Sequence, residues 1–181
     1  ATGFFNRMTE NRVDIAAMRA AGDADLNALV DGYEHYMDKL ATEPRVDQAS
    51  LQRHLLDHLH TAEGQQWLGD GFTVIVDEYQ DTNPIQEQVY FALAGSDGDL
   101  TVVGDDDQSL YRFRGASVES LVDFDVAWQH YLGTTPKPVY LRENRRSHNA
   151  IVDWVNTYIG GHPVMQSTGG IRVRAPGKPP L

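Results

Sequence analysis

Two short apolar runs, each followed by acidic residues, constrain the fold of this chain most. The first covers residues 72–76 and is rich in β-branched side chains, which suits a strand buried on both faces. The second covers residues 100–104. Between them, Asn83, Pro84 and Gly95 are typical of an N-cap, a first helical residue and a helix stop. A strand, a helix and a strand with short links predict a βαβ unit, and such units imply a parallel sheet.

Acidic residues stand at the end of both predicted strands. Asp77 and Glu78 follow the first strand, at the carboxyl end where open α/β sheets bind ligands. One such carboxylate can hold Mg²⁺, usually through water, and its neighbour can take a proton from an attacking water. The pair indicates phosphate chemistry, although a strand that simply stops at two solvated acids has the same pattern. We assign Asp105 to the same region, whereas Asp106 and Asp107 also fit a solvated turn.

Three longer segments extend this pattern. They are Val-Asp-Glu-Tyr-Gln-Asp-Thr-Asn at 76–83, Val-Gly-Asp-Asp-Asp-Gln-Ser-Leu-Tyr-Arg-Phe-Arg-Gly-Ala at 103–116, and Leu-Arg-Glu-Asn-Arg-Arg-Ser at 141–147. In order and spacing they resemble successive signature motifs of the UvrD/Rep/PcrA group of superfamily 1 DNA helicases. The resemblance is strong over residues 72–160 and faint elsewhere. It implies an α/β fold: a RecA-like P-loop NTPase core fragment, with a parallel sheet flanked by helices.

The resemblance also implies one ATP site between two RecA-like domains. Asp77 resembles the Walker B aspartate that holds Mg²⁺ through water, and Glu78 resembles the base that deprotonates the attacking water. Gln108 resembles the glutamine that senses the γ-phosphate and links it to the DNA groove, a role that suits an amide with both donor and acceptor. Arg146 matches an arginine that the second domain contributes to the γ-phosphate. Arg145 stands where the family usually has an adenine-packing tyrosine; a guanidinium plane can also stack on a ring, with an altered nucleotide preference.

Three residues of the second motif are expected to bind DNA. Phe113 occupies the aromatic position on which a base stacks, which is worth about 1–3 kcal/mol per base for any sequence. Arg114 beside it can reach phosphate, and Tyr111 is assigned to the same surface. The implied function is an ATP-dependent 3′-to-5′ DNA helicase that uses ATP and Mg²⁺ to translocate on single-stranded DNA and unwind duplexes. Its expected partners are single-stranded DNA, 3′-tailed duplex DNA, and repair or recombination proteins.

An alternative function is a non-catalytic helicase-like scaffold or a nuclease-associated module. The chain contains no Gly-x-x-x-x-Gly-Lys-Ser/Thr sequence, and its one Gly-Lys pair, at 177–178, precedes a proline. Without that loop no backbone amides cradle the phosphates, so we expect a middle piece of a longer helicase that is inactive by itself. Residues 1–70 are expected to lead into the first RecA-like domain, residues 71–136 to carry its Walker B and Gln-aromatic-Arg motifs, and residues 137–181 to begin the second.

The charge of the chain is strongly polarised. The net charge is −11, yet residues 137–181 hold seven Lys/Arg and two Asp/Glu, which leaves eight and 24 for residues 1–136. A basic segment can meet phosphate even in an acidic protein, although an arginine-rich tail without function has the same composition. No run approaches the roughly 20 apolar residues that span a bilayer, and no charged-then-apolar leader opens the chain. We therefore expect no membrane association. The lack of cysteine excludes disulfides and suits a cytoplasmic location, which we expect.

Helical apolar stripes precede and follow the predicted sheet. The first two contain Leu26, Leu29, Val30, Tyr33, Met37 and Leu40, and then Leu51, Leu55, Leu56 and Leu59, and core packing explains both. His54 and His58 are four residues apart, so both could bind one metal ion from the same face of a helix, although surface histidines without a ligand would show the same spacing. Ser147 is expected to cap a helix through about Ile159, after a short strand at residues 139–141. Arg146 would then lie at a strand-to-helix corner, from which it could project into a cleft between domains. A surface arginine without a function could occupy the same position.

Overall fold

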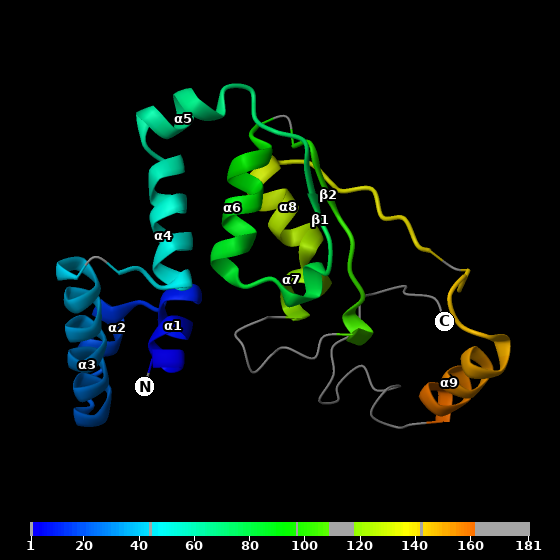
Figure 1. Ribbon diagram of the computed structural model, residues 1–181, viewed down its shortest axis with the longest axis horizontal. Coiled ribbons are helices and arrows are strands. Elements are labelled where there is room, and N and C mark those ends of the chain that lie inside the picture. The colour runs from blue at the N-terminus through cyan, green and yellow to red at the C-terminus, as the bar shows by residue number, and fades with distance from the viewer. Residues whose placement is uncertain (1, 44, 97, 109–117, 142, 162–181) are drawn as a thin grey trace.

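The structure is a computed structural model that describes residues 2–43, 45–96, 98–108, 118–141 and 143–161 (Figure 1). Strand β1 (Val74–Val76) pairs in parallel with β2 (Leu100–Val102), and α6 (Pro84–Ala94) joins them. The predicted βαβ unit is therefore confirmed, within a helix-rich α/β arrangement. The other helices of the described residues are α1 (Thr2–Glu10), α2 (Ile15–Ala20), α3 (Ala24–Thr42), α4 (Gln48–Leu59), α5 (Ala62–Leu68), α7 (Val118–Val122), α8 (Phe124–Leu132) and α9 (Asn149–Gly161).

Helix α6 begins and ends where the sequence predicts. Asn83 Oδ1 accepts a hydrogen bond from the Gln86 N–H at 2.9 Å, and Gln86 Oε1 accepts one from the Asn83 N–H at 3.0 Å. This reciprocal pair is a capping box, which satisfies two donors that the first helical turn leaves without partners. Pro84 follows as the first helical residue, and Gly95 ends the helix with a φ of 67°.

Two hydrophobic clusters lie on either side of α6. The first contains Leu56, Leu59, Leu68, Ile85 and Val89, from α4, α5 and α6. The second contains Val76, Tyr79, Phe91, Ala94 and Leu100, with Leu121, Phe124, Trp128 and Leu132 packed against it. Figure 1 shows α6 between α4 and the two strands. Because α6 contributes side chains to both clusters, it holds the N-terminal helices and the sheet together.

The two N-terminal stripes form the predicted helices, α3 and α4, but only part of each stripe is buried: in the first, Val30 and Tyr33 are buried and the other four residues are partly exposed. Leu56 and Leu59 are buried, whereas Leu51 is 58% exposed and Leu55 is 41% exposed. The prediction that the whole stripe packs in the core is therefore wrong for these two leucines. At 3.6 residues per turn, Leu51 lies about 140° around the helix from Leu56. Leu56 and Leu59 pack with Ile85 and Val89 of α6, whereas Leu51 and Leu55 lie on the exposed side of α4.

The segment before α9 differs from the prediction in two ways. Residues 139–141 form no strand, and Val139 and Leu141 are 75% and 88% exposed, because no described strand lies beside them. Helix α9 begins at Asn149, later than a Ser147 N-cap requires, and continues through Gly161. The first-turn Ala150 N–H donates to His148 Nδ1 at 3.2 Å. His148 thus supplies the side-chain acceptor that Ser147 was expected to provide.

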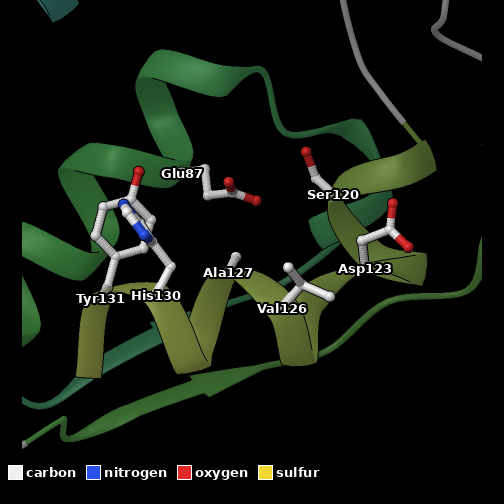
Figure 2. Close-up of a pocket in the computed structure, with 7 residues that line it drawn as sticks. All are labelled: Glu87, Ser120, Asp123, Val126, Ala127, His130 and Tyr131. Carbon is white, nitrogen blue, oxygen red and sulfur yellow. The ribbon is translucent and has the colours of Figure 1, made fainter. Parts of the chain in front are cut away.

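A shallow hollow of about 330 Å³ lies between α6 and α8 (Figure 2). It is lined by Glu87, Ser120, Asp123, Val126, Ala127, His130 and Tyr131. None of the site residues predicted from the sequence lines it. The hollow is therefore separate from the acids that follow the two strands.

Glu87 is an acid that α6 places at the edge of the second cluster. Its Oε2 accepts a hydrogen bond from the Tyr79 O–H at 3.0 Å. Burial raises the pKa of the Glu87 carboxyl above its ordinary 4.5, and hydrogen bonds from Tyr79 and Ser120 only partly offset the rise. Burial, followed by the nearby Glu87 charge, also raises the pKa of Tyr79. The Tyr79–Glu87 contact anchors the turn after β1 to α6.

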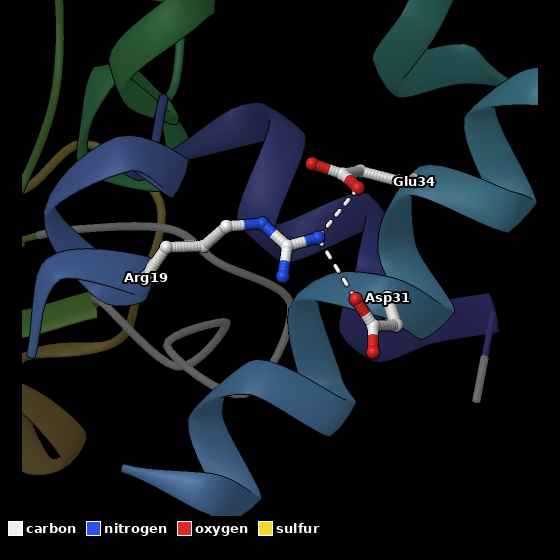
Figure 3. Close-up of polar contacts among 3 residues, drawn as sticks. All are labelled: Arg19, Asp31 and Glu34. Carbon is white, nitrogen blue, oxygen red and sulfur yellow. Dashed lines mark hydrogen bonds and ion pairs between the residues drawn. The ribbon is translucent and has the colours of Figure 1, made fainter. Parts of the chain in front are cut away.

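The N-terminal helices carry an exposed ion-pair group (Figure 3). Arg19 Nη2 of α2 lies 2.6 Å from Glu34 Oε2 and 2.8 Å from Asp31 Oδ1, both on α3. Hydrogen bonds to Glu34 and then to Asp31 raise the pKa of Arg19 above its usual value. Exposed pairs of this kind add little to stability. Helix α2 has no buried residue, whereas α3 buries Val30 and Tyr33. No helix in the described part of the chain is long and apolar enough to cross a membrane.

Loss of the α6 cap should destabilise the fold. We expect Asn83→Ala to lower the free energy of unfolding by about 1 kcal/mol, because it removes the acceptor for the Gln86 N–H. Urea denaturation of the 181-residue chain measures this change. Asp123→Ala is a matched control, because Asp123 occupies the N-cap of α8 without a side-chain capping bond. An equal loss of stability in both variants would contradict the capping role of Asn83.

Burial of Glu87 should make stability depend on pH. The pKa of Glu87 is higher in the folded chain than in the unfolded chain, so stability is lost as pH rises through the folded value. A glutamine side chain at this position would carry no charge and would keep an oxygen acceptor for Tyr79. We therefore expect Glu87→Gln to match the wild type at pH values below 4.5 and to be more stable at pH values above the folded pKa, as measured by urea denaturation across the pH range.

The control for this experiment is Glu63→Gln, in the exposed first turn of α5. It should show no stability gain that grows with pH. A Glu87→Gln variant that is less stable than the wild type at neutral pH would show that the ionised carboxylate stabilises the fold.

Candidate nucleotide site at the strand ends

Strand β1 delivers Asp77 and Glu78 to its carboxyl end, as predicted, and both side chains are exposed there. Asp77 Oδ1 accepts a hydrogen bond from the Glu78 N–H at 2.9 Å. Glu78 has φ 52° and ψ 43°, a left-handed conformation that is uncommon for a residue with a side chain. Such a residue costs about 1–3 kcal/mol and persists only where surrounding contacts hold it. The turn is thus a strained position that presents two carboxylates.

The residues after Glu78 supply those contacts. Tyr79 is 0% exposed and Gln80 is 1% exposed, although they follow two solvent-facing acids. The Tyr79 N–H donates to the Val103 carbonyl at 2.9 Å, and the Val103 N–H donates to the Val76 carbonyl at 2.8 Å. These bonds continue the pairing beyond the ends of both strands. They fix the turn after β1 against the segment after β2.

Side chains extend this connection to Gln108. Gln80 Nε2 donates to Glu78 Oε2 at 2.6 Å, and Gln80 Oε1 accepts from the Asp105 N–H at 3.0 Å. Gln108 Nε2 then donates to Asp105 Oδ2 at 2.8 Å. A path of hydrogen-bonded groups therefore runs from Glu78 through Gln80 and Asp105 to Gln108. The structure brings together three of the predicted site residues, Asp77, Glu78 and Gln108.

Gln80 is the member of this path to which the sequence analysis assigned no role. Its position offered a signal, because it lies two residues after Glu78 and within the same motif. The signal was weak, because an amide there has no distinguishing spacing or charge. Its importance follows from a contact with Asp105, which is 25 positions away in the chain.

The acids after β2 have different environments. Asp105 takes part in the path to Gln108, which agrees with its assignment to the same region as Asp77. Asp106 is only 4% exposed, so its interpretation as a solvated turn acid is wrong. The short helical turn at Asp106–Gln108 draws the Asp106 side chain inward. The Asp107 side chain lies outside the described residues.

The two predicted arginines lie apart from this group. Arg145 is exposed and pairs with Glu143, with Nη2 at 2.8 Å from Oε2. Arg146 is also exposed, and its N–H donates to Asn144 Oδ1 at 3.0 Å. Figure 1 shows that the chain after α8 runs past the strands and leads into α9, which lies away from them. Among the described residues, neither arginine bonds to Asp77, Glu78 or Gln108, so their convergence on one site stays a prediction.

The remaining candidates are the predicted DNA contacts and the two histidines of α4. Tyr111, Phe113 and Arg114, the predicted DNA contacts, lie outside the described residues. His54 and His58 are exposed on α4. Within the part of the chain that the structure describes, no three His, Asp or Glu side chains are grouped as ligands for a metal ion.

The fold and this group of residues define an α/β domain with an acidic turn at the carboxyl end of a parallel strand, a location suited to nucleotide chemistry. The family model for the UvrD/REP helicase N-terminal domain matches residues 2–129. The chain belongs to this family of helicase domains.

Individual relatives agree with the family. The chain is 42% identical over 79 residues to a putative ATP-dependent DNA helicase, YjcD, of Bacillus subtilis, a match covering 44% of the chain and 10% of the relative. It is 38% identical over 103 residues to the ATP-dependent DNA helicase Rep of Escherichia coli, covering 55% and 14%. It is 41% identical over 88 residues to DNA helicase II of Escherichia coli, covering 48% and 11%. These matches span a small part of each relative.

Proposed function

We propose that this chain is part of the RecA-like core of an ATP-dependent 3′-to-5′ DNA helicase, where it supplies the Walker B turn. The hydrogen-bonded path from Glu78 to Gln108 carries this proposal, because it connects a strained acidic turn to a second polar residue across two adjacent strand ends. Family membership and the names of the relatives, which are DNA helicases, support ATP use and DNA binding. Translocation, its direction and duplex unwinding rest on the resemblance to that family.

Asp77 is proposed to hold Mg²⁺ through water. Its carboxylate is exposed at the strand end, and the Glu78 N–H engages only its Oδ1 atom, which leaves Oδ2 for a water ligand. Magnesium prefers oxygen ligands and keeps several of its waters, so one exposed carboxylate fits it. Bound beside the phosphates of ATP, the ion would neutralise negative charge during phosphoryl transfer.

Glu78 is proposed to be the base that orients the attacking water and takes its proton. Its side chain is exposed at the end of the strand, and Gln80 Nε2 holds one of its oxygens at 2.6 Å. The other oxygen is available to accept a hydrogen bond from water. Because the carboxylate is fixed before the nucleotide arrives, little reorganisation would be needed for proton transfer.

Gln108 is proposed to report the state of the γ-phosphate to the DNA-binding surface. Its amide is exposed, and its Nε2 is held by Asp105 at 2.8 Å, while its Oε1 has lone pairs for a further partner. The adjacent residues Tyr111, Phe113 and Arg114 are proposed to contact single-stranded DNA. A small movement of Gln108 would therefore reach the DNA contacts through a few residues of chain.

Arg145 and Arg146 are proposed to complete the site from the second RecA-like domain. The exposed positions of both residues leave them accessible to a nucleotide, with Arg145 against the base and Arg146 against the γ-phosphate. In this proposal residues 1–70 lead into the first domain, residues 71–136 carry the Walker B turn and Gln108, and residues 137–181 begin the second. Single-stranded DNA, 3′-tailed duplexes, and repair or recombination proteins are the proposed partners.

Replacement of the proposed base should abolish turnover. In a full-length helicase that contains this chain, we expect Glu78→Gln to keep ATP binding and lower kcat by about 10²–10⁴-fold, the usual contribution of a positioned base. Steady-state hydrolysis and nucleotide-binding titrations measure the two effects. Glu63→Gln is the matched control, because it makes the same change at an exposed position of α5. Near-normal turnover in Glu78→Gln would remove Glu78 as the base.

The 181-residue chain alone should hydrolyse ATP poorly. The sequence Gly-x-x-x-x-Gly-Lys-Ser/Thr, whose amides and lysine cradle phosphates, does not occur in it. We expect no magnesium-dependent phosphate release above that of the same chain with Glu78→Gln. Phosphate release at saturating ATP checks this, and clear turnover that depends on Glu78 would show that the chain needs no such loop.

A further inference from the structure

The side chain of Gln80 is buried in a turn that otherwise faces solvent. It is 1% exposed, whereas Asp77 and Glu78 in the same turn are exposed. A buried primary amide requires partners for both its donor and its acceptor. Gln80 has both, because Nε2 donates to Glu78 Oε2 and Oε1 accepts from the Asp105 N–H. The amide therefore bridges two segments that follow different strands.

The bond to Glu78 has the properties of an orienting contact. Its N···O distance of 2.6 Å is that of a short bond to a carboxylate, and such charge-assisted bonds are stronger than neutral ones. The exposed Glu78 side chain would otherwise rotate among several rotamers. Gln80 thus restricts the carboxylate to one orientation.

Gly104 shows that the amide has little room to move. A Cβ atom at position 104 would lie 2.8 Å from Gln80 Oε1 and 3.3 Å from the Gln80 backbone nitrogen. The glycine therefore permits the backbone before Asp105 to pass directly against Gln80. The Gln80 amide is enclosed by this backbone on one side and bonded at both of its ends.

We propose that Gln80 is a positioning residue that orients the Glu78 carboxylate and, through the Asp105 N–H, couples it to the segment that carries Gln108. This inference rests on the proposed function, in which Glu78 is the base. Gln80 acts through Glu78 and Asp105 rather than on the nucleotide. Its loss should therefore slow the chemical step and leave nucleotide binding in place.

Two substitutions separate the two bonds. Gln80→Met keeps a side chain of similar length but removes both the donor and the acceptor. Gln80→Glu keeps an acceptor for the Asp105 N–H, but at pH 8 it replaces the donor with a charge that repels Glu78. Gln66→Met is the control for the methionine change, because Gln66 is exposed on α5.

The first measurement is amide hydrogen exchange at Asp105, followed by NMR in the 181-residue chain. We expect exchange about fivefold to tenfold faster in Gln80→Met, which is the effect of losing one net hydrogen bond. Gln66→Met should exchange at the wild-type rate, and Gln80→Glu, which keeps the acceptor, should exchange more slowly than Gln80→Met. Unchanged exchange in Gln80→Met would overturn the inference, and this result does not depend on ATP hydrolysis.

The second measurement is steady-state ATP hydrolysis by a full-length helicase that contains the chain. We expect both Gln80 variants to lower kcat by about tenfold to a hundredfold, as misplaced catalytic groups do, with KM for ATP within twofold of wild type. A residue with a purely structural role would instead reduce thermal stability and alter kcat and KM together. That result, or an unchanged kcat in Gln80→Met, would overturn the inference.

The two proposals fail in different ways. If Glu78→Gln hydrolyses ATP normally, the proposed base is wrong and the positioning role falls with it. If Glu78→Gln is inactive but Gln80→Met turns over normally, the proposed function stands and only the role of Gln80 is overturned.

Discussion

The packing of α6 between two hydrophobic clusters is the interaction on which the rest of the structure depends. Ile85 and Val89 face the N-terminal helices, whereas Phe91 and Ala94 face the strands. No other described helix contributes buried residues to both clusters. The capping box begins α6 a few residues after the acidic turn. The packing of α6 therefore also fixes the end of the segment that contains this turn. The position of the proposed site is therefore set by the packing of the core rather than by contacts within the turn after β1.

Burial of two residues supports the strained backbone at Glu78. Tyr79 is the largest fully buried side chain of the described residues, and its hydroxyl reaches Glu87 on α6. The next residue, Gln80, is buried and bonded on both sides. A left-handed glutamate costs about 1–3 kcal/mol, an amount that burial of one aromatic ring can offset. The arrangement keeps a charged side chain in solvent while the residues after it are held in the core.

The parts of the fold that could be predicted from the sequence depend on local signals. Asn83, Pro84 and Gly95 each act within one helical turn, so the limits of α6 followed from residue type alone. The location of the acids at a strand end followed from the apolar run before them. The side of α4 that is buried could not be predicted in this way, because it depends on α1 and α6. The partners of Gln80 also depend on tertiary contacts, and residues 139–141 have beside them none of the strands that the structure describes, although their apolar character predicted a strand.

The close approach of Gly104 to Gln80 has a consequence for how such sequences diverge. The glycine and the glutamine belong to different motifs, yet a methyl group added to one would displace the other. A residue with a side chain at position 104 would therefore fit only if the Gln80 amide and the neighbouring Leu121 side chain shifted. The two motifs, although separated along the chain, are therefore held together by a steric restriction at Gly104 as well as by the hydrogen bonds between them.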